Sequence, residues 1–309
     1  ISTPNDDIAS ISDSVHDLDR ECHYLYRSGE RWEFRPEPNI NKMIEDRATG
    51  VDYEDSRRLV LNRVAQAYGK GSFADAAAFV ANPEEVTDRA GAPILRLTSN
   101  VELAKQIVEY KDAPNAEGIR PHRIYRCQVV LLAPEPSLLD RAVKAQQRVT
   151  AAEELKTEFA RDNSQKNSAR DVEKKLVDLR KHAVLASIRS FSRLVRSVKE
   201  GPKEYSVTED AYFSDGTTSN LANRLLDWLK ARGFALTADS EGLGGLKTER
   251  LFNTAVKIED GVANTAALLE ALRREPGGPA VFAEDPLRKG IISAVKEGRL
   301  VFKSRDGAA

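Results

Sequence analysis

The spacing of hydrophobic and polar positions changes several times along the first seventy residues. Residues 13–22 have helical spacing, and apolar and polar positions then alternate from 23 to 35 on both sides of a Ser-Gly pair, which predicts a β-hairpin. A spacing of three and four residues returns after it. This spacing predicts a helix capped by Asn39 and a second helix that ends at Gly69.

The next part of the chain alternates between strand and helix patterns. Residues 73–81 and 93–99 are typical of short strands, and Asn100 is placed to cap a helix that follows the second of them. The segment 126–135 contains the continuous apolar run 129–132, which indicates a strand buried on both faces, as in the middle of a parallel sheet. Strand and helix in alternation predict an open α/β sheet.

Residues 137–200 are almost entirely helix-forming. A polar stretch from 162 to 168 is compatible with a turn between two long helices or with a solvated part of one helix. The expected second helix extends to Gly201-Pro202, and its apolar face contains Leu176, Leu179, Ile188, Phe191, Val195 and Val198.

The last hundred residues read as a separate lobe. Helical patterns are found at 218–232, 247–257, 262–273 and 285–298, the first two separated by a glycine-rich loop, and residues 299–304 predict a terminal strand. Helix, turn, helix and strand in this order fit a winged-helix module and fit any other small α+β lobe equally well.

Together these patterns predict an α/β chain with a partial open parallel sheet, a long helical insertion and a small C-terminal α+β lobe that is winged-helix-like. We expect a helical segment with a β-hairpin at 1–72, a sheet portion at 73–136, a long helical arm at 137–202 and the lobe at 203–309.

Composition excludes several classes of protein. Hydrophobic residues make up 41% of the chain, and 47 basic against 48 acidic side chains give a net charge of −1. These values exclude a disordered polyelectrolyte and a globally basic nucleic-acid binder. No apolar run reaches membrane-spanning length, and the first residues do not resemble a signal peptide. Cys22 and Cys127 form no disulfide framework or zinc motif, so we expect a cytoplasmic protein.

The neutral total conceals an uneven distribution of charge. Residues 1–60 carry 8 basic and 14 acidic side chains, whereas residues 141–200 carry 15 basic and 8 acidic ones. The net charges of −6 and +7 therefore predict an acidic segment and a basic segment.

No complete catalytic motif is present. The glycine-rich segments 69–72 and 242–248 lack the spacing of a phosphate-binding P-loop, and the four histidines have no metal-ligand spacing. There is also no nucleophile elbow of a serine hydrolase. Cys127 begins the buried strand and is interpreted as a small core residue. We therefore expect this chain to hold no cofactor or metal of its own and to have no catalytic activity when isolated.

Two groups of arginines are candidate contact residues. The first group flanks the hairpin and leads into the buried strand, where guanidinium groups could contact a nucleotide or a neighbouring subunit: Arg31, Arg35, Arg123 and Arg126. Solvation or pairing with nearby acids is the alternative. The second group falls at positions i, i+4 and i+7 of the expected long helix. Such a stripe either contacts a phosphate backbone or is simply a solvated face of the helix. Its members are Arg189, Arg193 and Arg196.

The segments 23–48 and 118–135 resemble motifs of a bacterial and archaeal family of predicted ATP-binding proteins, catalogued as domain of unknown function 499. Cys127 stands where the family usually has Asn. The resemblance covers about residues 20–205. The positions that match the family pattern in the first segment are Arg31, Trp32, Phe34, Pro38, Asn39, Asn41, Asp46 and Arg47.

Members of this family look like AAA-related P-loop ATPases whose Walker motifs lie upstream of this region, often in phage-defence or DNA-restriction neighbourhoods. The resemblance implies that this chain is the portion after the Walker motifs, that ATP and Mg²⁺ belong to the parent protein, and that the upstream ATPase domain is its partner. The start at Ile1 and the single methionine, Met43, agree with a piece of a longer protein.

Two further hypotheses stay open beside this one. The chain would be a nucleic-acid-binding module without enzymatic activity, using the basic helix 180–200 and the winged-helix-like C-terminus to bind DNA. Alternatively it would be an oligomerisation fragment, with the long helices as the interface between copies of the chain. No membrane partner is expected.

Overall fold

The computed structural model describes residues 18, 24–28, 31–34, 39–162, 165–200, 204–212, 218, 220–240 and 264–301. They fall into two compact units, which are treated separately below. The helical unit combines residues up to 61 with residues 140–187, and the sheet unit combines residues 62–139 with those from 188 onward. The chain is mixed α/β, as the sequence predicts.

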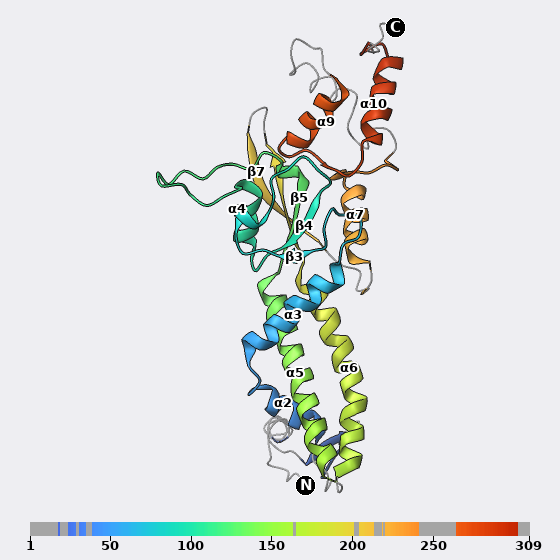
Figure 1. The fold of residues 1–309 in the computed structure, drawn as a ribbon. Helices are drawn as coiled ribbons and strands as arrows, with labels where there is room; N and C mark the ends of the chain where they lie inside the picture. The colour runs from blue at the N-terminus through green and yellow to red at the C-terminus, as the bar shows by residue number, and fades with distance from the viewer. Residues whose placement is uncertain are drawn as a thin grey trace, which may run out of the picture. The chain divides into compact units, whose positions relative to one another are not determined.

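The helical unit is built from the hairpin and from helices distant in sequence (Figure 1). Strands β1 (Leu25–Ser28) and β2 (Arg31–Phe34) pair antiparallel, which confirms the predicted hairpin. The helices are α2 (Ile40–Ala48), most of α3 (Tyr53–Tyr68), and the greater parts of α5 (Pro136–Arg161) and α6 (Lys166–Ser190). The expected helix at 13–22 lies outside the described residues, apart from Leu18.

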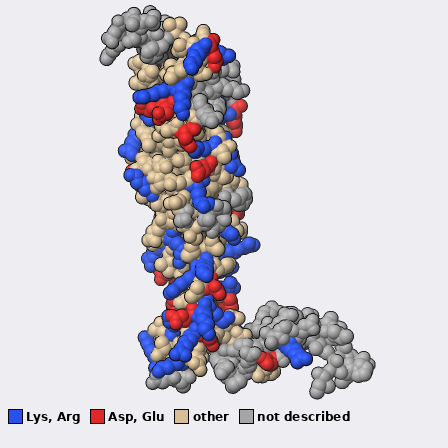
Figure 2. All heavy atoms as spheres, turned by 90° about the vertical axis from the view of Figure 1, so that its right-hand side faces the viewer, with Lys and Arg blue, Asp and Glu red and all other residues tan. Residues whose placement is uncertain are grey.

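Apolar residues of α2, α5 and α6 form one continuous core in this unit. Ile44 of α2, Val149 and Leu155 of α5, and Val172 and Leu176 of α6 are all buried in it. Burial of these side chains explains why a short helix such as α2 is stable, since isolated helices of this length are marginal in water. Figure 2 shows Lys and Arg side chains interspersed with Asp and Glu over the surface of this unit.

Side chains cap the N-termini of several helices, and the caps at Asn39 and Asn100 are those expected from the sequence. The Asn39 side chain accepts a hydrogen bond from the Asn41 backbone N–H at 3.1 Å, and Asp52 Oδ1 accepts one from Asp55 N at 2.7 Å. Asn100 caps α4 (Val101–Glu109) by accepting from Leu103 N at 2.8 Å. Each bond satisfies an N–H that the first turn of a helix leaves without an intrahelical partner.

The sheet unit contains a five-stranded sheet in the order β3-β4-β5-β6-β7. Its strands are β3 (Ala78–Phe79), β4 (Ile94–Leu97), β5 (Val129–Ala133), β6 (Arg193–Lys199) and β7 (Tyr205–Ala211), with 3₁₀ turns at Pro83–Glu85 and Arg126–Gln128. All five residues of β5 are buried, as its apolar run predicts. Apolar residues of α4 pack against this sheet and close the core.

The sheet is mixed, and it contains the parallel strand pairs that the sequence predicts. Strands β3, β4 and β5 are parallel, but β6 is antiparallel to β5 and β7 is antiparallel to β6. The expected helix up to residue 200 is therefore wrong beyond Ser190, because residues 193–199 form β6. Apolar residues such as Leu194 and Val195 fit both a helical and an extended reading, and pairing between two strands decides for the sheet.

The C-terminal lobe consists of α7 (Leu221–Ala231), β8 (Ala235–Leu236), α9 (Thr265–Arg274), β9 (Ala280–Val281) and α10 (Asp285–Lys296). Strands β8 and β9 are parallel. The predicted glycine-rich loop and the helix at 247–257 lie outside the described residues. Residues 299–301 do not form the beginning of the predicted terminal strand, so the described part of the lobe gives a winged helix no support.

Within the described part of the chain, no helix combines the length and the apolar character needed to cross a lipid bilayer.

Candidate functional site

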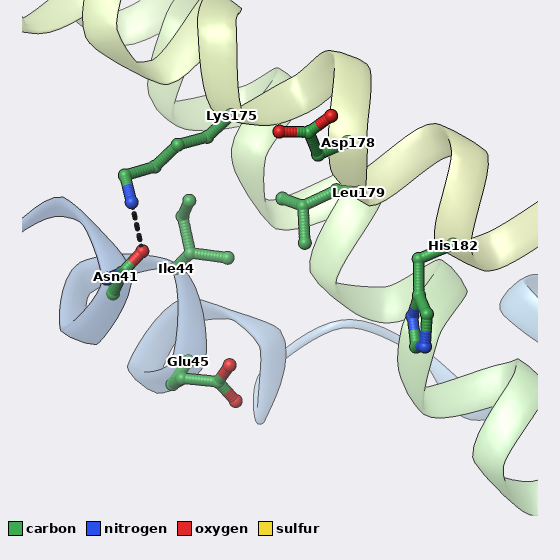
Figure 3. Close-up of a pocket in the computed structure, with 7 residues that line it drawn as sticks. All are labelled: Asn41, Ile44, Glu45, Lys175, Asp178, Leu179 and His182. Carbon is green, nitrogen blue, oxygen red and sulfur yellow. Dashed lines mark hydrogen bonds between the residues drawn. The ribbon is translucent and has the colours of Figure 1, made fainter.

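A pocket of about 310 Å³ lies in the helical unit, between α2 and α6 (Figure 3). Helix α2 contributes Asn41, Ile44 and Glu45, and α6 contributes four side chains, one or more from each of three successive turns. The lining residues from α6 are Lys175, Asp178, Leu179 and His182. Ile44 is buried in the core of the unit and Leu179 packs against that core, so the pocket has an apolar floor and a charged rim.

Several rim groups are held in place by hydrogen bonds and ion pairs. Lys175 Nζ donates to Asn41 Oδ1 and so joins α6 to α2 (Figure 3). The Glu45 carboxylate lies 2.9 Å from Nε of Arg148 on α5. Asp178 and His182 lie one turn apart on α6 and are exposed. The rim therefore presents carboxylates and basic side chains side by side.

This arrangement suits a small polar ligand or a charged peptide side chain better than a metal ion. Among the residues that the structure describes, no group of three His, Cys, Asp or Glu side chains could hold a metal. A second hollow of about 480 Å³ lies between α5 and α6. Its lining includes Arg180, which pairs with Glu153 at 2.7 Å, and Lys156, which pairs with Glu173 at 2.7 Å.

The structure places the candidate arginines of the first group on different elements. Arg31 is exposed on β2, and Arg35 lies outside the described residues. Arg126 is half-buried, and its Nε donates to the backbone carbonyl of Arg123 at 3.2 Å.

Arg123 is a correction to the sequence-based interpretation, because its side chain is only 2% exposed. Its guanidinium group donates to four backbone carbonyls, those of Ile107 and Val86 at 2.9 Å, Pro83 at 3.1 Å and Tyr110 at 3.3 Å. Burial lowers the pKa of Arg123, and the nearby Asp88 opposes that shift. A group whose donors are directed at the protein's own backbone is not available to a nucleotide.

The second group of arginines does not form a helical stripe, which is a further correction. Arg189 is exposed near the end of α6, whereas Arg193 and Arg196 lie on β6. Arg193 Nε donates to Glu135 at 2.7 Å, and Arg196 Nε donates to Asp210 at 2.7 Å. Because both strand arginines are paired with carboxylates, they present little free positive charge to a phosphate backbone.

One polar cluster of the sheet unit has no signal in the sequence. Tyr125 donates a hydrogen bond from its hydroxyl to Glu270 on α9, and Arg274 lies near the same ring. The bond to Glu270 and then burial raise the pKa of Tyr125. Beside it, the buried thiol of Cys127 donates to the backbone carbonyl of Arg273 at 2.9 Å, and this burial agrees with the expected core role.

Comparisons of the chain with models of protein families, with curated proteins and with solved structures found no match.

Proposed function

We propose that this chain is the non-Walker, C-terminal region of a larger ATPase and that it serves assembly and coupling. The observation that carries the proposal is the insertion of the α5–α6 hairpin between two neighbouring strands of the sheet. The chain leaves the sheet at the end of β5, passes through both helices and returns as β6, directly beside β5. An insertion of this kind joins the helical unit through the chain itself to two adjacent strands of the sheet.

The two ends of the insertion are joined to each other. The backbone N–H of Glu135 donates to the carbonyl of Ser190 at 2.8 Å, and the Glu135 carboxylate accepts from Arg193. The same partner raises the pKa of Arg193, chiefly through that hydrogen bond. The helices, of 26 and 25 residues, are each about 38 Å long at 1.5 Å per residue. Because the two ends of the α5–α6 hairpin are joined at the sheet, we expect a conformational change at these ends to be transmitted along the helices.

Arg31 and Arg126 are the candidates that we retain for contact with a nucleotide or a neighbouring subunit. Both belong to segments that resemble the ATPase family, and Arg31 is exposed. ATP and Mg²⁺ would be held by the upstream domain, and an arginine supplied from outside that domain would stabilise charge on the transferred phosphate. DNA binding through Arg193 and Arg196 is not proposed, since both are paired within the sheet.

The test is ATP turnover by the complete protein from which this chain derives, with Arg31→Ala and Arg126→Ala as variants. We expect each variant to lower the turnover at least about tenfold with unchanged folding, because an arginine that reaches the phosphates stabilises the transition state. The matched control is Arg58→Ala, an exposed arginine whose only described ion pair is a local one with Asp55. Turnover equal to wild type in both test variants would eliminate the contact role.

Coupling is tested separately by Glu135→Gln, which weakens the pair with Arg193 at the base of the insertion. In the complete protein we expect ATP turnover below that of wild type with unchanged folding, because a change at this base would no longer be transmitted through the helices. A Glu135→Gln variant with the ATP turnover of wild type argues against transmission through this base.

A further inference from the structure

We propose that the exposed face of α6 binds a double-stranded nucleic acid through its backbone phosphates. This inference is independent of the proposed ATPase role. Five side chains define the surface, which we term the α6 stripe. They lie at positions i, i+4, i+8, i+11 and i+15 of one helix, within an arc of about 80° at 3.6 residues per turn: Lys166, Arg170, Lys174, Val177 and Lys181.

The stripe lies on the opposite side of α6 from the core. Val172, Leu176 and Ala183 point into the apolar cluster of the helical unit and are buried, whereas every residue of the stripe is exposed. The packing of the buried side fixes the rotation of the helix about its axis. The four cations are therefore presented to solvent by a rigid element, at positions that do not depend on a loop.

Most of the charge on the stripe is not neutralised within the protein. Lys174 has one ion pair, with Asp171 at 3.0 Å. Lys166, Arg170 and Lys181 form no ion pair with any residue that the structure describes. Other cations of the same unit are paired across helices, such as Arg148 with Glu45 and Lys156 with Glu173.

The unpaired cations of the α6 stripe have an energetic cost, because like charges one turn apart repel and destabilise a helix. Lys166, Arg170 and Lys174 follow one another at that spacing, so the free helix bears an electrostatic cost along its exposed side. A polyanion lying along the stripe would remove this repulsion.

The chemistry of the stripe favours a phosphate backbone over a protein partner. Stable protein interfaces usually contain a desolvated centre with aromatic or large apolar anchors. The only apolar member of the stripe is Val177, which is 50% exposed. Lysine and arginine without such an anchor are typical of binding by charge neutralisation and counterion release.

The lack of exposed Phe, Tyr and Trp side chains on α5 and α6 also favours a double strand over a single strand. Single-stranded nucleic acids are commonly bound by stacking their bases on aromatic side chains. The only Phe, Tyr or Trp in α5 and α6 is Phe159, which is buried in the core. From Lys166 to Lys181 the stripe is about 22 Å long, which spans about six phosphates of one strand in a duplex.

The test measures binding of the full 309-residue chain to duplexes of about 25 base pairs by fluorescence anisotropy, between about 50 and 200 mM salt. The measurement is made with DNA duplexes and again with RNA duplexes, which shows which of the two nucleic acids the stripe prefers. The variant is Arg170→Glu with Lys181→Glu. The matched control, Arg288→Glu with Lys296→Glu, makes the same change of net charge on the exposed side of α10.

We expect the stripe variant to weaken binding at least about tenfold at the lowest salt and to reduce the slope of log K against log salt by about 2, because two phosphate contacts are lost. The control should bind as wild type. If the double Glu variant does not fold, Arg170→Gln with Lys181→Gln provides the same comparison with a smaller loss.

Three results would overturn the proposal. The first is equal weakening by the α10 control, which would show that net charge alone drives binding. The second is tighter binding of a single strand than of the duplex. The third is competition by poly-glutamate as effective as that of DNA at equal charge, which would favour an acidic protein partner.

Discussion

The guanidinium group of Arg123 joins two separate segments of backbone to the segment that contains Arg123 itself. Its hydrogen bonds reach Pro83 and Val86 before β4, and Ile107 and Tyr110 at the end of α4. A buried cation is stable only when its donors are satisfied, and here backbone carbonyls satisfy them. The residue therefore acts as a structural centre for the loops beside the sheet.

We expect Arg123→Ala to lower the free energy of unfolding by about 3–5 kcal/mol, because it leaves several buried carbonyls without a donor. Chemical denaturation followed by circular dichroism measures this change. The control is Arg120→Ala, whose guanidinium lies 5.5 Å from the centre of the Tyr110 ring and should contribute about 1 kcal/mol or less. Equal effects of the two variants would contradict the structural role of Arg123.

Asp239 gives the stability a dependence on acid pH. Hydrogen bonds from Lys230 and then from Thr237 lower its pKa to about 2 from an ordinary value of 3.8. Because the folded-state pKa is lowered, the stabilising effect is present above about pH 4 and disappears as the pH falls toward 2. We expect Asp239→Asn to be less stable than wild type at pH 7, with a difference in Tm that vanishes near pH 2. A difference that is constant over this range would show that the carboxylate is not involved.

Some of these residue roles can be predicted from the sequence and others cannot. Asn39 and Asn100 are recognisable as caps because a cap depends on only three or four neighbouring residues. Arg123 is recognisable only as one of several arginines, since its burial depends on loops up to forty positions away. For the same reason the pocket residues Lys175 and Asp178 carry no signal that pairs them with α2.

Among the elements, β6 shows where periodicity fails. Its apolar residues continue the spacing of α6 closely enough to extend the predicted helix, and only pairing with β5 and β7 distinguishes the strand. The buried strand β5 was predicted correctly because a continuous apolar run has few alternative interpretations. The parallel direction of β4 and β5 follows from the helix between them, whereas the antiparallel return of β6 depends on a long insertion.

The turn before β9 depends on a glycine that lies against β6. Gly277 has a φ of +73°, and a Cβ added there would lie 2.3 Å from the backbone N of Lys199. We expect Gly277→Ala to lower the free energy of unfolding by more than about 2 kcal/mol, from the left-handed backbone and the clash together. Gly298→Ala is the control, since Gly298 has a φ of +69° with nothing within 4 Å, and it should cost only about 1 kcal/mol. Equal shifts of the denaturation midpoint in the two variants would show that the clash at Gly277 contributes nothing to stability.

At the scale of the whole molecule, the sheet unit depends on a small polar contact to join its C-terminal helices to the sheet. Tyr125 precedes β5 and bonds to Glu270 of α9, while Cys127 bonds to the backbone of Arg273 on the same helix. These residues are about 145 positions apart, so the contact closes a long loop of chain. The lobe is thus attached to the sheet by specific hydrogen bonds as well as by apolar packing.

We expect Tyr125→Phe to destabilise this attachment by about 1–3 kcal/mol, since a hydrogen bond to a charged acceptor is lost. Hydrogen exchange of the α9 amides should become faster, while exchange in α5 should not change. The raised pKa of Tyr125 means that the bond stabilises the fold below about pH 10 and that this contribution is lost as the pH rises further. Tyr205→Phe, at an exposed tyrosine, is the control.

The closed base of the α5–α6 insertion has a consequence for how this chain tolerates changes of length. Since the backbones of Glu135 and Ser190 are hydrogen-bonded to each other, the sheet does not depend on the distance that the chain travels between them. Shortening α5 and α6 by the same number of whole turns keeps the same faces of the two helices in contact. The pairing of Ala133 with Arg193 is unchanged. The length of the α5–α6 hairpin can therefore change while the sheet stays unaltered.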